Sequence, residues 1–251
     1  MREPTTDAAT NGVVGMTVTR TGFWSAVLTA VLATISFGMA VTTPPRSGPF
    51  AAPGTAITYP YSDAAQFVPR DFLWMYPAVL MMLAYLVLAA CLHEAAAGER
   101  KLFGTLGLCF STVAFALITA DYFIQIQTVQ PGLLLGEGPS LAALSQYNPH
   151  GLFITLENLG FIVTGLSFAF LAGTLGASRV ERAARWVLVV SAALVMLTFA
   201  GMSAYFGFRL EYLFEVAVIS VVWWTLVAAG VLLAISFRGR LAALAADVEP
   251  V

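Results

Sequence analysis

Six long apolar segments, separated by short polar stretches, constrain the fold of this chain more than any other feature. Each approaches the roughly 20 residues that a helix needs to cross the hydrocarbon core of a bilayer. They occupy residues 23–41, 72–92, 102–122, 150–175, 186–206 and 212–237. Of the 251 residues, 59% are hydrophobic and only 10% are charged, whereas soluble domains are about one quarter charged. We therefore predict an all-α, multi-pass membrane protein, folded as a six-helix transmembrane bundle.

The polar stretches divide the chain into a membrane domain and two tails. Residues 1–20 are polar and lack periodicity, so they predict an irregular tail, and residues 241–251 form a second tail after a single membrane domain over 21–240. The first span exceeds the roughly 7 to 15 apolar residues of a signal peptide, so we expect it to be retained. Residues 42–71 are rich in Pro, Gly and Ser, which predicts a non-helical cap over one face of the bundle.

The distribution of basic residues predicts that both termini lie in the cytoplasm, because cytoplasmic loops of membrane proteins are enriched in Lys and Arg. With the N-terminus inside, nine of the 12 basic residues fall on the cytoplasmic side: Arg2, Arg20, Arg100, Lys101, Arg179, Arg182, Arg185, Arg238 and Arg240. Three fall outside, namely Arg46, Arg70 and Arg209. The cap and the 130–149 connection then face the exterior. Frequent Ala and the preference for Arg over Lys hint at a bacterial source, and hence at the bacterial cytoplasmic membrane.

Several function classes find no support in the sequence. The net charge is −2 and the basic residues are scattered, so nucleic acid is not an expected partner. Cys91 and Cys109 form no CxxC pair, and the His93–Glu94 dipeptide lacks the second His of a zinc protease motif. No P-loop, GxGxxG or GxSxG motif occurs. We therefore expect no cofactor and no metal, assign no catalytic residue, and favour a binding protein over an enzyme.

Three carboxyl groups fall in the same half of the predicted bundle. The stretch YNPHGLFITLENLGF, residues 147–161, places Glu157 about 10 Å into the fourth span if its helix begins at His150. Counting along the third and sixth spans places Asp121 and Glu215 near the same exterior face. A carboxylate within a membrane needs a partner, a proton or access to water, so it is a candidate site residue.

Helical phase indicates that Glu157 faces the interior of the bundle. The residues that share its face, at i−7, i−3, i+3 and i+7, are His150, Ile154, Gly160 and Thr164. Small and polar residues are typical of contacts between membrane helices. We therefore expect the Glu157 carboxyl to lie within about 8 Å of a polar side chain from the third or sixth span, because an acid that faces lipid is unfavourable.

These residues predict an acidic chamber that opens to the outside beneath the cap. The candidate ligand-binding or ion-binding residues are Glu157, Asp121, Gln125, His150, Asn158 and Glu215. Alternatively, Glu157 is a structural carboxyl that joins two helices by hydrogen bonds. Aromatic residues near the span ends are predicted to anchor the bundle at headgroup level, and to line a site only if the fold turns them inward. They are Trp24, Trp74, Tyr76, Trp186 and Tyr212.

The leading functional hypothesis is a membrane protein that binds or transports a small molecule or ion through this chamber. Its acidity favours a cation, a proton or an amine as the ligand. One alternative is a membrane enzyme that acts on a lipid or isoprenoid in the outer leaflet, with Glu157 or Asp121 as acid or base and His150 as its helper. Another is an accessory or scaffold subunit without a site of its own. The lipid bilayer is the expected partner under each of these three hypotheses. A lipid ligand and a homo-oligomer are compatible with all three hypotheses.

Overall fold

The structure, a computed structural model, describes residues 5–207 and 209–246. This part of the chain is all-helical and contains no strand. Its six long helices are α1 (Thr5–Thr42), α2 (Met75–Glu94), α3 (Arg100–Ile124), α6 (Leu152–Ala172), α7 (Arg179–Phe206) and α8 (Glu211–Ala246). Each contains a segment that is long and apolar enough to cross a membrane. The predicted all-α class and the six spanning helices are therefore confirmed, and they are compatible with a multi-pass membrane protein.

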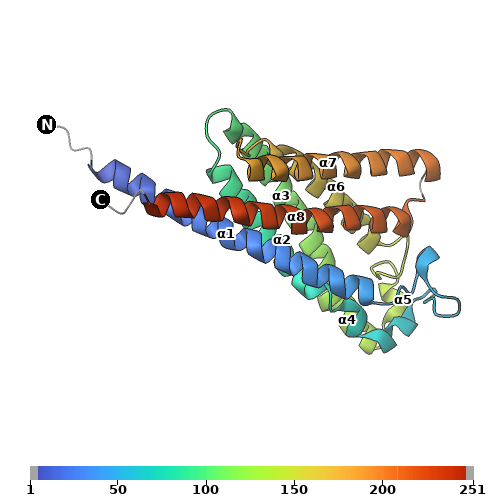
Figure 1. The fold of residues 1–251 in the computed structure, drawn as a ribbon. Coiled ribbons are helices and arrows are strands. Elements are labelled where there is room, and N and C mark those ends of the chain that lie inside the picture. Colours follow the sequence, from blue (N-terminus) through green and yellow to red (C-terminus); the bar gives the residue numbers. More distant parts are fainter. Residues whose placement is uncertain (1–4, 208, 247–251) are drawn as a thin grey trace.

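The six helices pack in a closed ring that follows their order in the chain. Each long helix contacts the next one, and α1 closes the ring by packing along α8. In Figure 1 both ends of the chain lie at one end of the bundle, and the cap lies at the other. A further contact crosses the ring between α6 and α8. That contact determines where the carboxyl groups meet.

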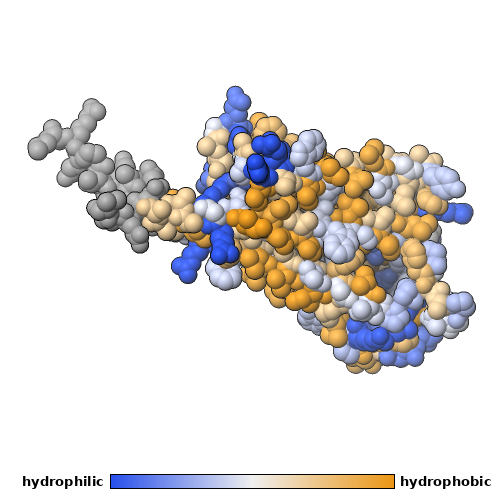
Figure 2. All heavy atoms as spheres, in the orientation of Figure 1, coloured by the Kyte–Doolittle hydropathy of each residue, from blue (hydrophilic) through white to orange (hydrophobic). Residues whose placement is uncertain are grey.

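Apolar side chains cover the middle of the bundle, and polar residues gather toward its two ends (Figure 2). Large hydrophobic residues remain exposed on the long helices, among them Trp24 on α1, Leu80 on α2, Leu197 on α7 and Trp224 on α8. A soluble protein rarely exposes so much contiguous apolar surface. Such exposed apolar side chains are compatible with a helix bundle that lies in a lipid bilayer.

Several helices are longer than their apolar segments. Residues 5–20 were expected to form an irregular tail, but α1 begins at Thr5; residues 1–4 and 247–251 of the predicted tails lie outside the described residues. Likewise α8 continues to Ala246. Helix α7 begins at Arg179 rather than at residue 186, because the Ser178 side chain caps it by accepting a hydrogen bond from the Glu181 N–H (3.2 Å). A hydropathy pattern identifies only the apolar part of a helix, so it does not detect polar turns at the helix ends.

The third span also continues beyond its predicted end. After α3 the chain forms a π-helical turn, η4 (Gln125–Val129), and then α4 (Gln130–Leu134), which together make a helical run of 35 residues from Arg100 to Leu134. A short helix, α5 (Gly138–Leu141), follows in the connection to α6.

The fourth span begins two residues later than expected. Its N-cap is Gly151, so His150 precedes α6 and does not share a helical face with Glu157. The Asn148 side chain stabilises the turn that precedes this N-cap. Its side chain accepts from the His150 N–H (3.0 Å) and donates to the Ala142 carbonyl (3.0 Å).

The predicted cap over residues 42–71 is ordered around one ion pair. It contains three short 3-10 turns, η1 (Gly48–Phe50), η2 (Ser62–Phe67) and η3 (Arg70–Phe72). Arg46 donates from Nε to Asp71 Oδ2 at 2.6 Å, and its guanidinium lies 3.4 Å from the centre of the Phe67 ring. Tyr147, in the connection before α6, donates to the same Asp71 oxygen at 3.0 Å. The cap and that connection therefore close together over the end of the bundle.

Candidate ligand-binding site

Glu157 lies in the interior of the bundle and is fully buried. The hydroxyl of Tyr122, on α3, donates a hydrogen bond to Glu157 Oε1 at 2.6 Å. The predicted contact between Glu157 and a polar side chain of a neighbouring span is thus confirmed. Tyr122 itself was not among the predicted candidates, although it directly follows Asp121 in the sequence. Helical periodicity predicts that only one of two adjacent residues faces the interior, whereas Asp121 and Tyr122 are both buried.

Glu215, on α8, reaches the same place from across the ring. Its side chain interacts directly with that of Glu157, while one oxygen of each carboxyl, Oε2, has no hydrogen-bond partner. Asp121 on α3 is buried nearby, acts electrostatically on both glutamates and also has an unpartnered oxygen, Oδ2. The fold therefore gathers the three predicted carboxyl groups where α3, α6 and α8 meet.

This grouping does not have the arrangement of a metal centre. Within residues 5–207 and 209–246, no set of three or more His, Cys, Asp or Glu side chains is placed to hold a metal ion. The groups that act on the Glu157 and Glu215 pair are Tyr122 and Asp121, neither of which is basic. Two adjacent carboxylates in a low-dielectric interior would repel each other strongly, and a proton or a cation beside them would relieve that repulsion.

The remaining predicted residues take other positions. Gln125 is buried and donates from Nε2 to the Leu144 carbonyl at 2.6 Å, which ties the π-helical turn to the connection before α6. Asn158 is half-buried, and its Oδ1 has no partner. His150 is exposed and precedes the helix. The expectation that His150 shares the face of Glu157 is therefore wrong.

A pocket of about 400 Å³ lies beneath the cap, between the end of α1 and the beginning of α8. Most of its wall is apolar, and its aromatic residues come from α1, the cap, the residue that precedes α2, the connection before α6, α6 itself and α8. Its lining includes Phe37, Arg46, Trp74, Tyr212, Glu215 and Trp223. Its volume lies within the range of small-molecule sites, about 300–1,000 Å³.

Three residues that line the pocket each have a buried polar atom without a hydrogen-bond partner. They are Glu215 (Oε2, an acceptor), Trp223 (Nε1, a donor) and Asp71 (Oδ1, an acceptor). The other oxygen of Asp71, Oδ2, is bonded to Arg46 and Tyr147. Unsatisfied buried polar groups are unfavourable in a folded protein, so these three atoms mark the pocket as a candidate binding site.

Two of the predicted interfacial aromatics turn inward to this pocket. Trp74 is 8% exposed and Tyr212 is 6% exposed, whereas Trp24 and Trp186 are more than half exposed, as interfacial anchors should be. Trp223, in the middle of an apolar segment, had no distinguishing sequence signal. Its role depends on the packing of α8 against α1 and the cap.

Tyr147 fixes the cap at the edge of the pocket. Burial raises the pKa of its phenol well above the ordinary value, and the nearby Asp71 carboxylate raises it further. Tyr147 therefore remains a hydrogen-bond donor to Asp71 at neutral and mildly alkaline pH. The donor keeps the Arg46–Asp71 pair in place beside the pocket.

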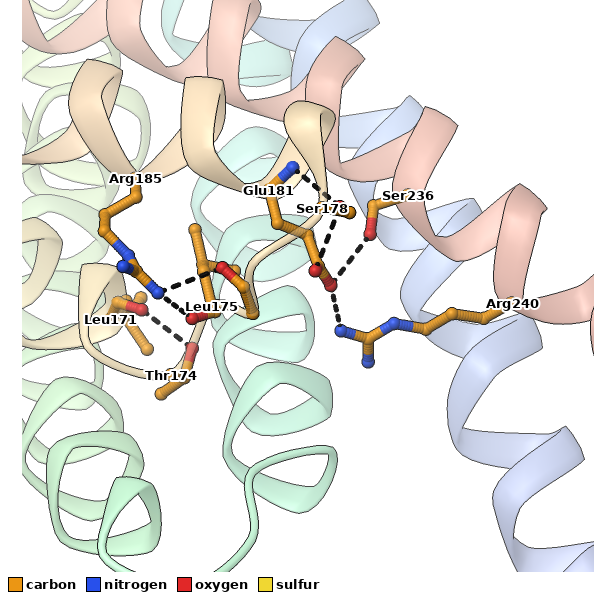
Figure 3. A network of polar contacts seen from close by, with 9 residues as sticks. Leu171, Thr174, Leu175, Ser178, Glu181, Arg185, Ser236 and Arg240 are labelled. Carbon is orange, nitrogen blue, oxygen red and sulfur yellow. Dashed lines mark hydrogen bonds and ion pairs between the residues drawn. The ribbon is translucent and has the colours of Figure 1, made fainter.

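A second polar network lies at the opposite end of the bundle (Figure 3). The Glu181 carboxylate accepts hydrogen bonds from Arg240 and Ser236 on α8 and from Ser178 before α7. Arg185 donates to the backbone carbonyls of Leu175 and Gly176, which follow α6. These bonds join three helices at their ends, and the charge of Glu181 is paired within the network. We interpret the network as structural.

No known protein family, curated protein or solved structure matches this chain. Function must therefore be argued from the site itself.

Proposed function

We propose that this chain is a multi-pass membrane protein that binds a small organic cation in the pocket beneath the cap. The observation that carries the proposal is that Glu215, which has an unpartnered carboxyl oxygen, lines an aromatic pocket. A carboxylate attracts a cation, and the faces of Trp and Tyr rings attract ammonium groups. Arg46, the basic residue of this wall, is already paired with Asp71, so it does not neutralise Glu215.

The proposal includes an orientation in which both termini are cytoplasmic and the pocket faces the exterior. The terminal end of the described bundle carries Arg20, Arg100, Lys101, Arg179, Arg182, Arg185, Arg238 and Arg240, and the cap end carries Arg46, Arg70 and Arg209. Basic residues concentrate on the cytoplasmic side of membrane proteins. The ligand would then enter from outside the cell.

A thermal-shift measurement on the purified protein in detergent tests the proposal. The probes are benzyltrimethylammonium, a permanent cation, and 2,2-dimethylpropylbenzene, the neutral compound in which a carbon atom replaces the nitrogen. We expect the cation to raise the melting temperature by about 3 °C at ten times its Kd, because a ligand that binds only the folded state stabilises it by mass action. The neutral compound should have a much smaller effect.

Two variants locate the binding site. Glu215→Gln should keep the fold and abolish the shift with the cation, because it removes the charge and keeps the shape. Asp63→Asn is the matched control, since Asp63 is an exposed acidic residue of the cap that does not line the pocket; it should retain the full shift. Equal effects of the two probes on the wild-type protein would overturn the proposal, even if the Gln variant did not fold.

A further inference from the structure

We propose that a cation entering the pocket displaces the proton shared by Glu157 and Glu215, so that this protein exchanges a proton for its ligand. The inference rests on the proposed function and concerns the same pocket. It depends on an asymmetry between the two carboxyl groups. Glu215 lines the pocket, whereas Glu157 lies behind it, fully buried.

The charged and titratable groups around the pair come from few elements. Helix α3 contributes Asp121 and Tyr122, and of these Asp121 disfavours a second negative charge. The cap and the connection before α6 contribute Asp71, Arg46 and Tyr147, which bond to one another. Helix α8 adds Tyr212 beside Glu215. At this end of the bundle the described residues of α1 and α7 include no charged residue.

Before a cation binds, the pair has one proton and a net charge of −1, because Arg46, the basic residue among the described residues of the pocket wall, is already paired with Asp71. A cation that binds beside Glu215 supplies that positive charge, and the second carboxylate becomes favourable. The balance is one cation bound and one proton released to water through the pocket. The ligated pair and cation again sum to −1.

Tyr122 makes the deprotonated state of Glu157 accessible. Its hydroxyl donates to Glu157 Oε1 at 2.6 Å, and a hydrogen bond to a carboxylate stabilises the charged form. Trp223, which also lines the pocket, has a buried N–H without a partner, and a ligand that carries an acceptor atom beside its cationic group would satisfy it.

The pH dependence of binding tests the inference. Benzyltrimethylammonium has no titratable group, so any pH dependence of its Kd belongs to the protein. We expect titration calorimetry on the protein in lipid nanodiscs to give a Kd that falls up to tenfold per pH unit as the pH rises through the range in which the pair is protonated. Calorimetry in buffers of different ionisation enthalpy should show close to one proton released per ligand in that range.

Two variants assign the proton to the pair. Glu157→Gln should retain binding and lose most of the pH dependence, with less than a twofold change per pH unit, because the Gln amide can donate to the Glu215 carboxylate. Asp63→Asn should keep the wild-type slope. If the Gln variant also kept that slope, the proton would belong to another group and the inference would be wrong.

The wild-type result separates the two proposals. A wild-type Kd that does not change between about pH 5 and 8.5, with no proton released, would overturn proton exchange and leave the cation site intact. A wild-type protein that does not bind the cation at any pH in this range would overturn the proposed function itself.

Discussion

Tyr122 donates a hydrogen bond from its hydroxyl to the buried Glu157 carboxyl. A second buried tyrosine, Tyr85 on α2, makes a comparable bond of 2.6 Å to the Ser167 hydroxyl on α6. The two tyrosines differ in their partners, a carboxyl for Tyr122 and a neutral hydroxyl for Tyr85. Hydrogen bonds to charged groups are worth more than those between neutral groups, about 1.5–3 against about 0.5–1.5 kcal/mol.

Replacing each tyrosine by phenylalanine therefore measures the charge on Glu157. We expect Tyr122→Phe to lower the free energy of unfolding by about 2 kcal/mol if Glu157 is the charged member of the pair, and Tyr85→Phe to lower it by about 1 kcal/mol. Reversible unfolding in mixed detergent micelles gives both values. Equal losses would show that Glu157 carries the shared proton.

At the scale of the helices, Gly160 on α6 allows close packing against α3 because it has no side chain. A Cβ atom on Gly160 would lie 2.4 Å from Cγ1 of Ile118, a fully buried residue of α3. Gly201 on α7 is the opposite case, because a Cβ there would meet nothing within 4 Å. Close approach of α6 to its neighbours is what allows the Glu157 carboxyl to reach Tyr122.

We expect Gly160→Ala to lower the free energy of unfolding by about 1–3 kcal/mol, because Ile118 is β-branched and cannot move away without repacking. Gly201→Ala should be neutral or stabilising by up to about 1 kcal/mol, since Ala favours the helix. Thermal unfolding of the two variants in the same detergent checks the difference. A neutral effect at Gly160 would mean that the α3–α6 interface is looser than the structure shows.

Sequence patterns predict the elements of this protein better than its site. The six spans follow from segment length, because each backbone polar group must be satisfied within a helix in lipid. The depth of Glu157, Asp121 and Glu215 follows from counting residues. The contact between α6 and α8 cannot be predicted in this way. Helical phase shows which face of a helix is buried, but it does not show which other helix covers that face. For the same reason Trp74 could not be distinguished from Trp24 before the fold was known.

At the scale of the whole molecule, the closed ring places both ends of the chain at one end of the bundle and the pocket at the other. An even number of spans requires this arrangement whichever side of the membrane is cytoplasmic. The proposed orientation in the membrane rests on the uneven distribution of Lys and Arg between the two ends of the bundle. If the pocket exchanges a cation for a proton as proposed, the orientation decides which compartment supplies the cation and which receives the proton.

Reporter fusions can measure the orientation directly. Gly54 in the cap and Gly98 between α2 and α3 both lie in loops, and a Cβ at either position would meet nothing within 4 Å, so short insertions there should be tolerated. We expect alkaline phosphatase, which is active only outside the cytoplasm, to be active at Gly54 and inactive at Gly98. Green fluorescent protein, which fluoresces when folded in the cytoplasm, should give the reverse result. Activity of the phosphatase at Gly98 alone would place the pocket in the cytoplasm, and the ligand would then come from inside the cell. Such an outcome would reverse the direction of exchange while leaving the carboxyl pair and its pocket unchanged.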